Sequence, residues 1–315
     1  MQTRKPELTV VIPTYNRSTV LKRCLDALTG QTLSADLYEI IVADDGSSDD
    51  TRQTVERCAA GSQIPVSYLW QSNAGANAAR NLAITEASGR LLLFINDDTI
   101  ATPTMLTEHL QTHQGYPDES FSVLGKVTIS PQVPYSMFAK VHLDAMYALW
   151  RGKKELDWRA FYTCNVSVKK RFLEKYGLFE ESMRYHEDLE LSERLSHHGL
   201  RVIYNPHALG YHYHYLQEKE YLNVAKREGN ALAKWYKKSP HLKSELASIG
   251  FYLYMDTAKR IQYLFADLII NRLTIPFILK TARKISKTNE DIALAIYKKL
   301  FQALKREAIR HELAK

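Results

Sequence analysis

The sequence lacks most features that mark disulfide scaffolds, zinc fingers and membrane spans. Its three cysteines, Cys24, Cys58 and Cys164, lie far apart and form no CxxC pair. This excludes a disulfide framework and a zinc finger, and it favours free thiols in a reducing compartment. No uncharged apolar run reaches the roughly 18 residues that a transmembrane helix needs. The opening residues MQTRKPELTV predict no signal peptide, so we expect a cytoplasmic protein.

Two nucleotide-binding signatures are also missing. A dinucleotide-binding dehydrogenase has GxGxxG directly after its first strand, where this chain has PTYNRS. No GxxxxGK[ST] loop occurs, which argues against an ordinary P-loop kinase or ATPase. Any nucleotide must therefore be bound by other means.

The composition is that of a globular protein with an uneven charge. The chain has 315 residues, of which 45% are hydrophobic and 24% charged, and its formal net charge is +7. Much of the positive excess falls in the C-terminal third, in runs such as KWYKKS and LKTARKISK. These runs are either a solvated helical surface or a site of attraction for an anionic partner, such as a phosphorylated substrate or a lipid surface. No nucleic-acid partner is expected.

Residues 1–130 alternate between strand and helix patterns. Strands are predicted at 8–13, 38–47, 65–70, 90–95 and 120–129, and helices at 18–28, 49–59, 74–87 and 102–113. Strands separated by single helices predict parallel βαβ units, and strands that are apolar throughout predict a sheet covered on both faces. We therefore expect an α/β fold with ligands at the carboxyl ends of its strands.

Acidic side chains follow two of these strands. LLLFINDDTIA ends in Asn96, Asp97 and Asp98, and adjacent carboxylates repel each other unless a cation offsets them. They either cap the helix at 102–113 or bind Mg²⁺ or Mn²⁺, which prefer carboxylate oxygens and share them with substrate phosphates. Asp44 and Asp45, in VADDGSSDD, form a tight turn or accept hydrogen bonds from a nucleoside.

The start of the helix at 74–87 carries small residues and one cation. In NAGANAARN, these small residues let the backbone approach a ligand closely. Arg80 either points toward phosphates or toward Asp44 and Asp45, or it pairs with a neighbour on the helix surface.

In order and spacing, VVIPTYNR, IIVADDGSSDDT, NAGANAARN and LLLFINDD resemble the nucleotide-sugar-binding half of the family 2 glycosyltransferases. The later stretch from CNVSVKKRF to ALGYHYH is similar to that family's acceptor half, so the resemblance covers about residues 8–214. It implies a GT-A fold, in which a Rossmann-like, mostly parallel sheet is flanked by helices. The domains expected are 1–215, with a nucleotide-sugar half at 1–130 and an acceptor half at 131–215, and a helical region at 216–315.

The resemblance implies roles for individual residues. The nucleotide-sugar contacts would come from Pro13, Thr14, Tyr15, Arg17, Asp44, Asp45, Asn73, Gly75, Arg80, Asn96, Asp97 and Asn165. Asn96-Asp97-Asp98 falls on the family's DxD motif but begins with Asn, which removes one negative charge. Asp98 inherits the role of metal ligand for Mn²⁺ or Mg²⁺, and His212 matches a histidine that follows the last core strand.

HEDLELSERL resembles the family's ED motif. We expect Asp188 to be the base that deprotonates an acceptor hydroxyl and Glu187 to orient the acceptor, because a sugar hydroxyl is a poor nucleophile. The alternative is an acidic first helical turn with no catalytic role. A single displacement would invert the anomeric carbon. The absence of a QxxRW motif predicts the addition of one sugar per acceptor.

The sequence thus predicts an inverting, non-processive transfer from a nucleotide-diphospho-sugar, with UDP-sugars favoured, in bacterial cell-surface glycan synthesis. The acceptor would be a glycan, a lipid-linked molecule or a protein. A nucleotidyltransferase, or a sugar-nucleotide or glycan-binding module that has lost its activity, remains open. The basic C-terminal helices would pack on the catalytic domain, dock on the inner face of the cell membrane or form a homo-oligomer.

Overall fold

The computed structural model describes residues 5–315, and these form two compact units. The first unit contains the chain up to Pro134 together with Leu143–His214. The second contains Tyr135–His142 and Tyr215–Lys315. A short segment from the middle of the chain thus belongs to the C-terminal unit, and nothing in the sequence pattern indicates this exchange.

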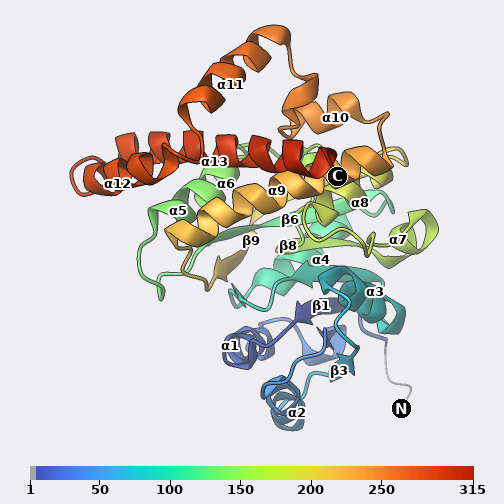
Figure 1. Ribbon diagram of the computed structural model, residues 1–315. Coiled ribbons are helices and arrows are strands. Elements are labelled where there is room, and N and C mark those ends of the chain that lie inside the picture. The colour runs from blue at the N-terminus through green and yellow to red at the C-terminus, as the bar shows by residue number, and fades with distance from the viewer. Residues whose placement is uncertain (1–4) are drawn as a thin grey trace. The chain divides into compact units, whose positions relative to one another are not determined.

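The first unit is built on one large sheet (Figure 1). Its strands are β1 (Leu8–Thr14), β2 (Tyr38–Asp44), β3 (Val66–Trp70), β4 (Leu91–Ile95), β5 (Thr99–Ala101), β6 (Phe121–Ile129), β7 (Glu155–Leu156), β8 (Asn165–Lys169) and β9 (Arg201–His212). They lie in the order β3-β2-β1-β4-β8-β6-β9-β5, with β7 paired to β9. Strands β1 to β4 are parallel to one another, whereas β8 runs antiparallel to its neighbours β4 and β6.

Helices cover both faces of this sheet. They are α1 (Ser18–Thr29), α2 (Thr51–Gly61), α3 (Ala76–Glu86), α4 (Met105–Gly115), α6 (Ala145–Ala148), α7 (Lys170–Tyr176) and α8 (Glu187–Ser196), with 3-10 turns at Ala35–Leu37 and Trp158–Ala160. Alternate residues of β1 enter different cores: Val10 packs with Leu25 of α1, and Val11 packs with Ala83 of α3. The expected mostly parallel α/β sheet, flanked by helices, is confirmed.

The acidic end of β4 does not cap the next helix. Helix α4 begins at Met105, later than the expected start at residue 102, and its N-cap residue is Thr104. Between the acids and the helix, Thr99–Ala101 forms the short strand β5, which pairs with the end of β9. The capping interpretation of Asp97 and Asp98 is therefore wrong.

The second unit is helical. Its elements are α5 (Met137–Ala139), α9 (Glu218–Lys238), α10 (Lys243–Ser248), a 3-10 turn at Tyr252–Tyr254, α11 (Thr257–Ile269), α12 (Ile275–Ile285) and α13 (Glu290–Leu313), and a π-helical turn at Lys140–Asp144 follows α5. Helices α9 and α13 lie side by side (Figure 1) and share a buried ion pair between Glu228 and Lys305 at 2.8 Å. Across the described chain, none of the helices has both the length and the apolarity needed to cross a bilayer.

Candidate active site

Two buried carboxylates lie at the carboxyl ends of β1 and β4. Asp97 and Asp98 directly follow β4 after Asn96, and both are almost completely buried. The Arg17 guanidinium, at the start of α1, holds them together: Nη1 donates to Asp97 Oδ1 at 2.6 Å and Nη2 to Asp98 Oδ2 at 2.9 Å. The hydroxyl of Thr14, the last residue of β1, donates to Asp97 Oδ2 at 2.8 Å. A cation from the chain itself thus offsets the repulsion between the two acids.

The two acids differ in their electrostatics. Burial raises the pKa of Asp97 to about 6, against the opposing effect of Arg17 and with the added repulsion of Asp98. Burial also acts to raise the pKa of Asp98, but hydrogen bonding and charge from His212, together with Arg17, hold that pKa well below its usual range. His212 ends β9, and its Nε2 lies 3.4 Å from Asp98 Oδ2. Asp98 is therefore the more strongly ionised member of the pair.

One oxygen of this pair has no partner. Asp98 Oδ1 is buried and accepts no hydrogen bond from the described residues. An orphaned, ionised oxygen beside an imidazole suits a divalent cation that takes few protein ligands and completes its shell with phosphate oxygens and water. No group of three or more His, Cys, Asp or Glu residues within the described chain is arranged to hold a metal without such help.

Asp44 and Asp45, at the end of β2, hold two turns in place. Asp44 accepts from the backbone N–H of Ser47 at 2.8 Å and from the hydroxyl of Tyr68 at 2.6 Å. Asp45 accepts from Gln71 and from the backbone N–H groups of residues 74 and 75. Both carboxylates are buried and engaged within the fold, so they shape the loop at 71–75 that leads into α3.

The loop at 71–75 depends on two of the expected residues. Asn73 donates from its side chain to the backbone oxygen of Asp45 at 3.0 Å. Gly75 has φ +103°, in the left-handed region, and an added Cβ would lie 1.5 Å from the Arg184 guanidinium. Arg184 was not anticipated from the sequence, because the chain returns to this loop from a distant turn.

Arg80 has a different partner from the ones expected. It is buried on α3, and its Nη1 donates to Asn77 Oδ1 at 3.0 Å and to Glu187 Oε1 at 3.1 Å. The interpretations that it faces Asp44 and Asp45, or pairs on the helix surface, are both wrong. Glu187 is the first residue of α8, so this ion pair joins helix α3 to the start of the ED motif.

Asp188 lies beside this ion pair and is only partly exposed. Burial and the neighbouring Glu187 charge raise the pKa of Asp188 to about 7, against the opposing charge of Arg80. The preceding residue, His186, has φ +59°, which is uncommon for a residue other than glycine. This turn places two consecutive carboxylates at the first turn of α8. A carboxyl with a pKa near 7 suits proton transfer at neutral pH.

Asn165 does not face a ligand. It is completely buried at the start of β8, and its Nδ2 donates to the backbone oxygens of Ala208 and Lys126. Its Oδ1 lies 2.8 Å from His109 Nε2, while His109 Nδ1 and His113 Nε2 both contact the Ser167 hydroxyl. The expected donor contact from Asn165 is therefore corrected to a structural role. Burial lowers the pKa of His109 to about 4, so this imidazole is neutral.

The remaining expected residues are placed as follows. Pro13 is buried in β1, Tyr15 is 48% exposed just beyond it, and Asn96 is partly buried between β4 and the two acids. Tyr15 is therefore open to a ligand, whereas Pro13 packs within the fold. The sequence did not indicate a role for the buried histidines of α4, although their i, i+4 spacing places them on one helix face.

The architecture is that of the GT-A nucleotide-sugar-binding fold. The structure of a mannosyltransferase from Pyrobaculum calidifontis, solved with GDP-Man and Mn²⁺, matches 99% of this chain and 88% of its own with a TM-score of 0.68 and 19% identity. The structure of S. aureus TarS residues 1–349 with UDP covers 97% of this chain and 91% of its own, with a TM-score of 0.56 and 18% identity. At these identities the likeness concerns the fold.

The chain matches the family described as Glycosyl transferase family 2 over residues 9–157. It is 28% identical over 239 residues to the validoxylamine A glucosyltransferase of Streptomyces hygroscopicus subsp. jinggangensis, covering 65% of this chain and 55% of that relative. An uncharacterized glycosyltransferase of Rickettsia prowazekii is 25% identical, covering 59% of this chain and 57% of its own. The matches thus span little more than half the length of these relatives.

Proposed function

We propose that this protein transfers a sugar from a nucleotide-diphospho-sugar to an acceptor hydroxyl, with inversion at the anomeric carbon. The observation that carries the proposal is the Asp188 carboxyl, which lies in the first turn of α8 next to the Arg80–Glu187 ion pair and has a pKa of about 7. The match to Glycosyl transferase family 2, and the solved structures of TarS with UDP and of the Pyrobaculum mannosyltransferase with GDP-Man, support this class of donor. UDP-sugars are the favoured donors, and cell-surface glycan synthesis is the favoured setting.

In the proposed reaction, Asp188 accepts the proton of the acceptor hydroxyl as its oxygen attacks the anomeric carbon. The bond from that carbon to the diphosphate oxygen breaks in the same step, so the configuration inverts and no enzyme nucleophile is needed. Glu187 is held by Arg80, and its charge helps to raise the pKa of Asp188. Tyr15, exposed at the end of β1, offers a ring to the nucleotide, and Asp45 and Asn73 shape the loop that would surround it.

Asp98 and His212 would hold a Mn²⁺ or Mg²⁺ ion, with Asp98 Oδ1 as its free oxygen. When bound, such a cation neutralises charge on a leaving diphosphate. The Pyrobaculum mannosyltransferase, solved with GDP-Man and Mn²⁺, lends support to this choice of metal.

The test is release of nucleoside diphosphate from a panel of sugar nucleotides, with and without Mn²⁺. Slow hydrolysis of one donor, or transfer to an added acceptor, supports the proposal. Asp188→Asn should abolish transfer while nucleotide binding remains, and Asp98→Ala should remove the Mn²⁺ dependence of binding. Release of pyrophosphate in place of a nucleoside diphosphate would favour a nucleotidyltransferase, and binding with no turnover would favour a binding module.

We further propose that the helical unit docks on an anionic lipid surface. Large apolar side chains on α11 and α12 are exposed, and we call them the α11–α12 apolar face: Ile261, Leu264, Phe265, Leu268, Ile269, Leu273 and Phe277. Single exposed apolar residues are ordinary, but several on one side of a helix mark an interaction site. The α11 members follow i, i+3, i+4, i+7 spacing, so they share one side of the helix.

The charges around this face favour lipid over a second protein copy. Asp267 is the single acid between Thr257 and Asn289, and it is already paired with Arg306 and Arg310. Seven cations share that segment: Lys259, Arg260, Arg272, Lys280, Arg283, Lys284 and Lys287. Arg272 and Arg283 pair with Glu307 and Glu218, and the other cations leave the segment positively charged. Exposed apolar side chains in a positively charged segment suit the boundary of a membrane that contains acidic headgroups.

Co-sedimentation with vesicles tests this docking. The protein should bind phosphatidylglycerol-containing vesicles and not pure phosphatidylcholine, and Leu268→Glu with Phe277→Glu should reduce binding at least about tenfold. Leu149→Glu, at a 71% exposed leucine of the first unit, is the matched control and should bind normally. Failure to bind anionic vesicles, together with a dimer that the double substitution dissociates, would contradict lipid docking and favour a homo-oligomer.

A further inference from the structure

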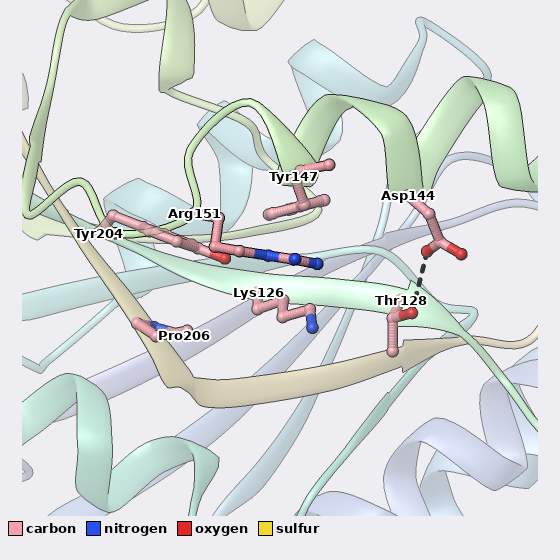
Figure 2. Close-up of a pocket in the computed structure, with 9 residues that line it drawn as sticks. Lys126, Thr128, Asp144, Tyr147, Arg151, Tyr204 and Pro206 are labelled. Carbon is pink, nitrogen blue, oxygen red and sulfur yellow. Dashed lines mark hydrogen bonds between the residues drawn. The ribbon is translucent and has the colours of Figure 1, made fainter.

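A separate cavity of about 350 Å³ lies between β6, β9 and the segment around α6. Figure 2 shows it with Lys126 reaching in from β6 and Arg151 from the loop after α6. The aromatic rings of Tyr147 and Tyr204 form further walls. This volume is within the range of pockets that hold small ligands.

The two cations of this cavity have no acidic partner. Neither Lys126 nor Arg151 forms an ion pair with a described Asp or Glu residue. One acid, Asp144, lines the cavity, and its Oδ1 is engaged by the Thr128 hydroxyl at 2.9 Å (Figure 2). Two uncompensated cations against one hydrogen-bonded carboxylate leave the cavity with a positive charge. Lysine and arginine converging on one space are a common arrangement for binding a phosphate group.

The cavity wall is linked by contacts to residues next to the two metal-ligand candidates. The Tyr147 hydroxyl lies 3.6 Å from Cys164 Sγ. The backbone oxygen of Cys164 accepts from the hydroxyl of Thr99, the residue after Asp98, at 3.3 Å. On the strand side, Thr128 of β6 pairs with Tyr211 of β9, one residue before the metal-ligand candidate His212. These contacts connect the cavity wall to the residues that neighbour Asp98 and His212.

We propose that Lys126 and Arg151 form a subsite for a phosphate group of the acceptor, so that the enzyme glycosylates a phosphorylated molecule. This inference rests on the proposed transfer reaction and deepens it. The phosphate is held by the two cations, and a hydroxyl of the same molecule extends toward Asp188. The phosphate source is either a polyprenyl phosphate lipid or a water-soluble polyol phosphate, and both offer the same charged group.

Binding is measured first, because it does not depend on turnover. Glycerol 3-phosphate and micellar polyprenyl phosphate are titrated into the full chain saturated with nucleoside diphosphate, with glycerol and polyprenol as uncharged matches. At least one phosphorylated probe should bind, and its uncharged match should not. Lys126→Gln and Arg151→Gln should each weaken that binding roughly tenfold or more, as expected for hydrogen bonds to a charged group. Lys153→Gln, which removes a charge from the same loop outside the cavity, should leave it unchanged.

Kinetics then separate this subsite from the donor site. Lys126→Gln should raise the KM for the phosphorylated acceptor and leave both the donor KM and the donor hydrolysis rate unchanged. If neither phosphorylated probe binds, if Lys153→Gln weakens binding as much as Lys126→Gln, or if the donor KM rises instead, the subsite is overturned. Absence of nucleoside diphosphate release from every donor would defeat the proposed reaction itself, whereas release with acceptors that need no phosphate defeats the subsite alone.

Discussion

Arg17 supplies the positive charge that the two adjacent acids after β4 require. Its guanidinium contacts both carboxylates, although its own side chain is 35% exposed. A divalent cation at Asp98 would share its oxygens with this arginine or displace it. The fold therefore has a built-in counter-ion when no metal is bound.

Replacing Arg17 should make stability depend on metal. Arg17→Met removes the guanidinium that contacts both buried carboxylates, so without divalent ions the free energy of unfolding should fall by about 1–2 kcal/mol, a value discounted for the partial exposure of Arg17. Mn²⁺ should then raise the Tm of the variant more than that of the wild type, as thermal unfolding would measure. Arg52→Met, at an exposed ion pair with Glu56, is the control. Equal Mn²⁺ shifts in wild type and Arg17→Met would contradict a metal site at Asp98.

Asp188 predicts how the rate depends on pH. Burial and Glu187 raise its pKa to about 7, so the native carboxyl stays protonated where the unfolded chain would already be ionised. That contribution to stability is lost as the pH rises through about 7, while the same ionisation produces the active base. The acceptor-saturated rate should therefore increase with pH and level off above about 7.

Two substitutions should move this profile in opposite directions. Glu187→Gln removes a like charge and frees Arg80, so the pKa of Asp188 should fall and the rate should rise at a lower pH. Arg80→Met removes a charge that lowers this pKa, so the rise should move to a higher pH. Rate profiles from pH 5 to 9 measure both. Shifts in the same direction would argue against Asp188 as the titrating group.

At the scale of elements, the backbone conformation of the loop between β3 and α3 shapes the proposed nucleotide site. Asp45 accepts the N–H groups of residues 74 and 75, and this arrangement requires the left-handed conformation at Gly75. An alanine there strains the backbone and meets Arg184.

Gly75→Ala should therefore cost about 1 kcal/mol or more of stability and weaken nucleotide binding. Gly61→Ala is the matched control, because Gly61 ends α2 with nothing within 4 Å of an added Cβ, and it should be neutral or stabilising. Denaturant unfolding and nucleotide titration measure the two effects. Normal nucleotide binding by Gly75→Ala would exclude this loop from the donor site.

The elements that the sequence predicts are those whose apolar pattern extends over several residues. The five strands at 8–13, 38–47, 65–70, 90–95 and 120–129 all form, because apolar runs between helices identify the strands of a covered sheet. The edge strand β3 is only partly buried. The three-residue strand β5 is too short to show a period, and it forms because β9 lies beside it. Likewise, the Arg80–Glu187 pair joins residues 107 positions apart, and no local pattern indicates such a partner.

At the scale of the whole molecule, positive charge is concentrated in the helical unit. The chain carries a net +7, and the segment from Thr257 to Asn289 that contains the α11–α12 apolar face has seven lysine and arginine residues and one acid. Both apolar burial and electrostatic attraction are therefore expected to contribute to lipid docking. A change in salt concentration distinguishes the two contributions, because salt screens only the electrostatic one.

Raising NaCl from 0.05 to 0.5 M should weaken binding to phosphatidylglycerol vesicles by roughly tenfold or more, because the surface charges are screened. Nucleotide binding in the first unit should change much less, since its charges are buried. Vesicle flotation across a salt series measures the first, and nucleotide titration at the same salts measures the second. Salt-independent flotation would leave apolar burial as the sole driving force.

The exchange of Tyr135–His142 between the units has a consequence for protein synthesis. Phe138 of this segment packs against Tyr221 and Tyr297, with ring centroids 5.2 and 4.9 Å away. As the chain leaves the ribosome, Phe138 emerges long before α13 exists to cover it. A truncation after His214 would leave that ring exposed, so shortened versions of this protein should be prone to aggregate even though their sheet is complete.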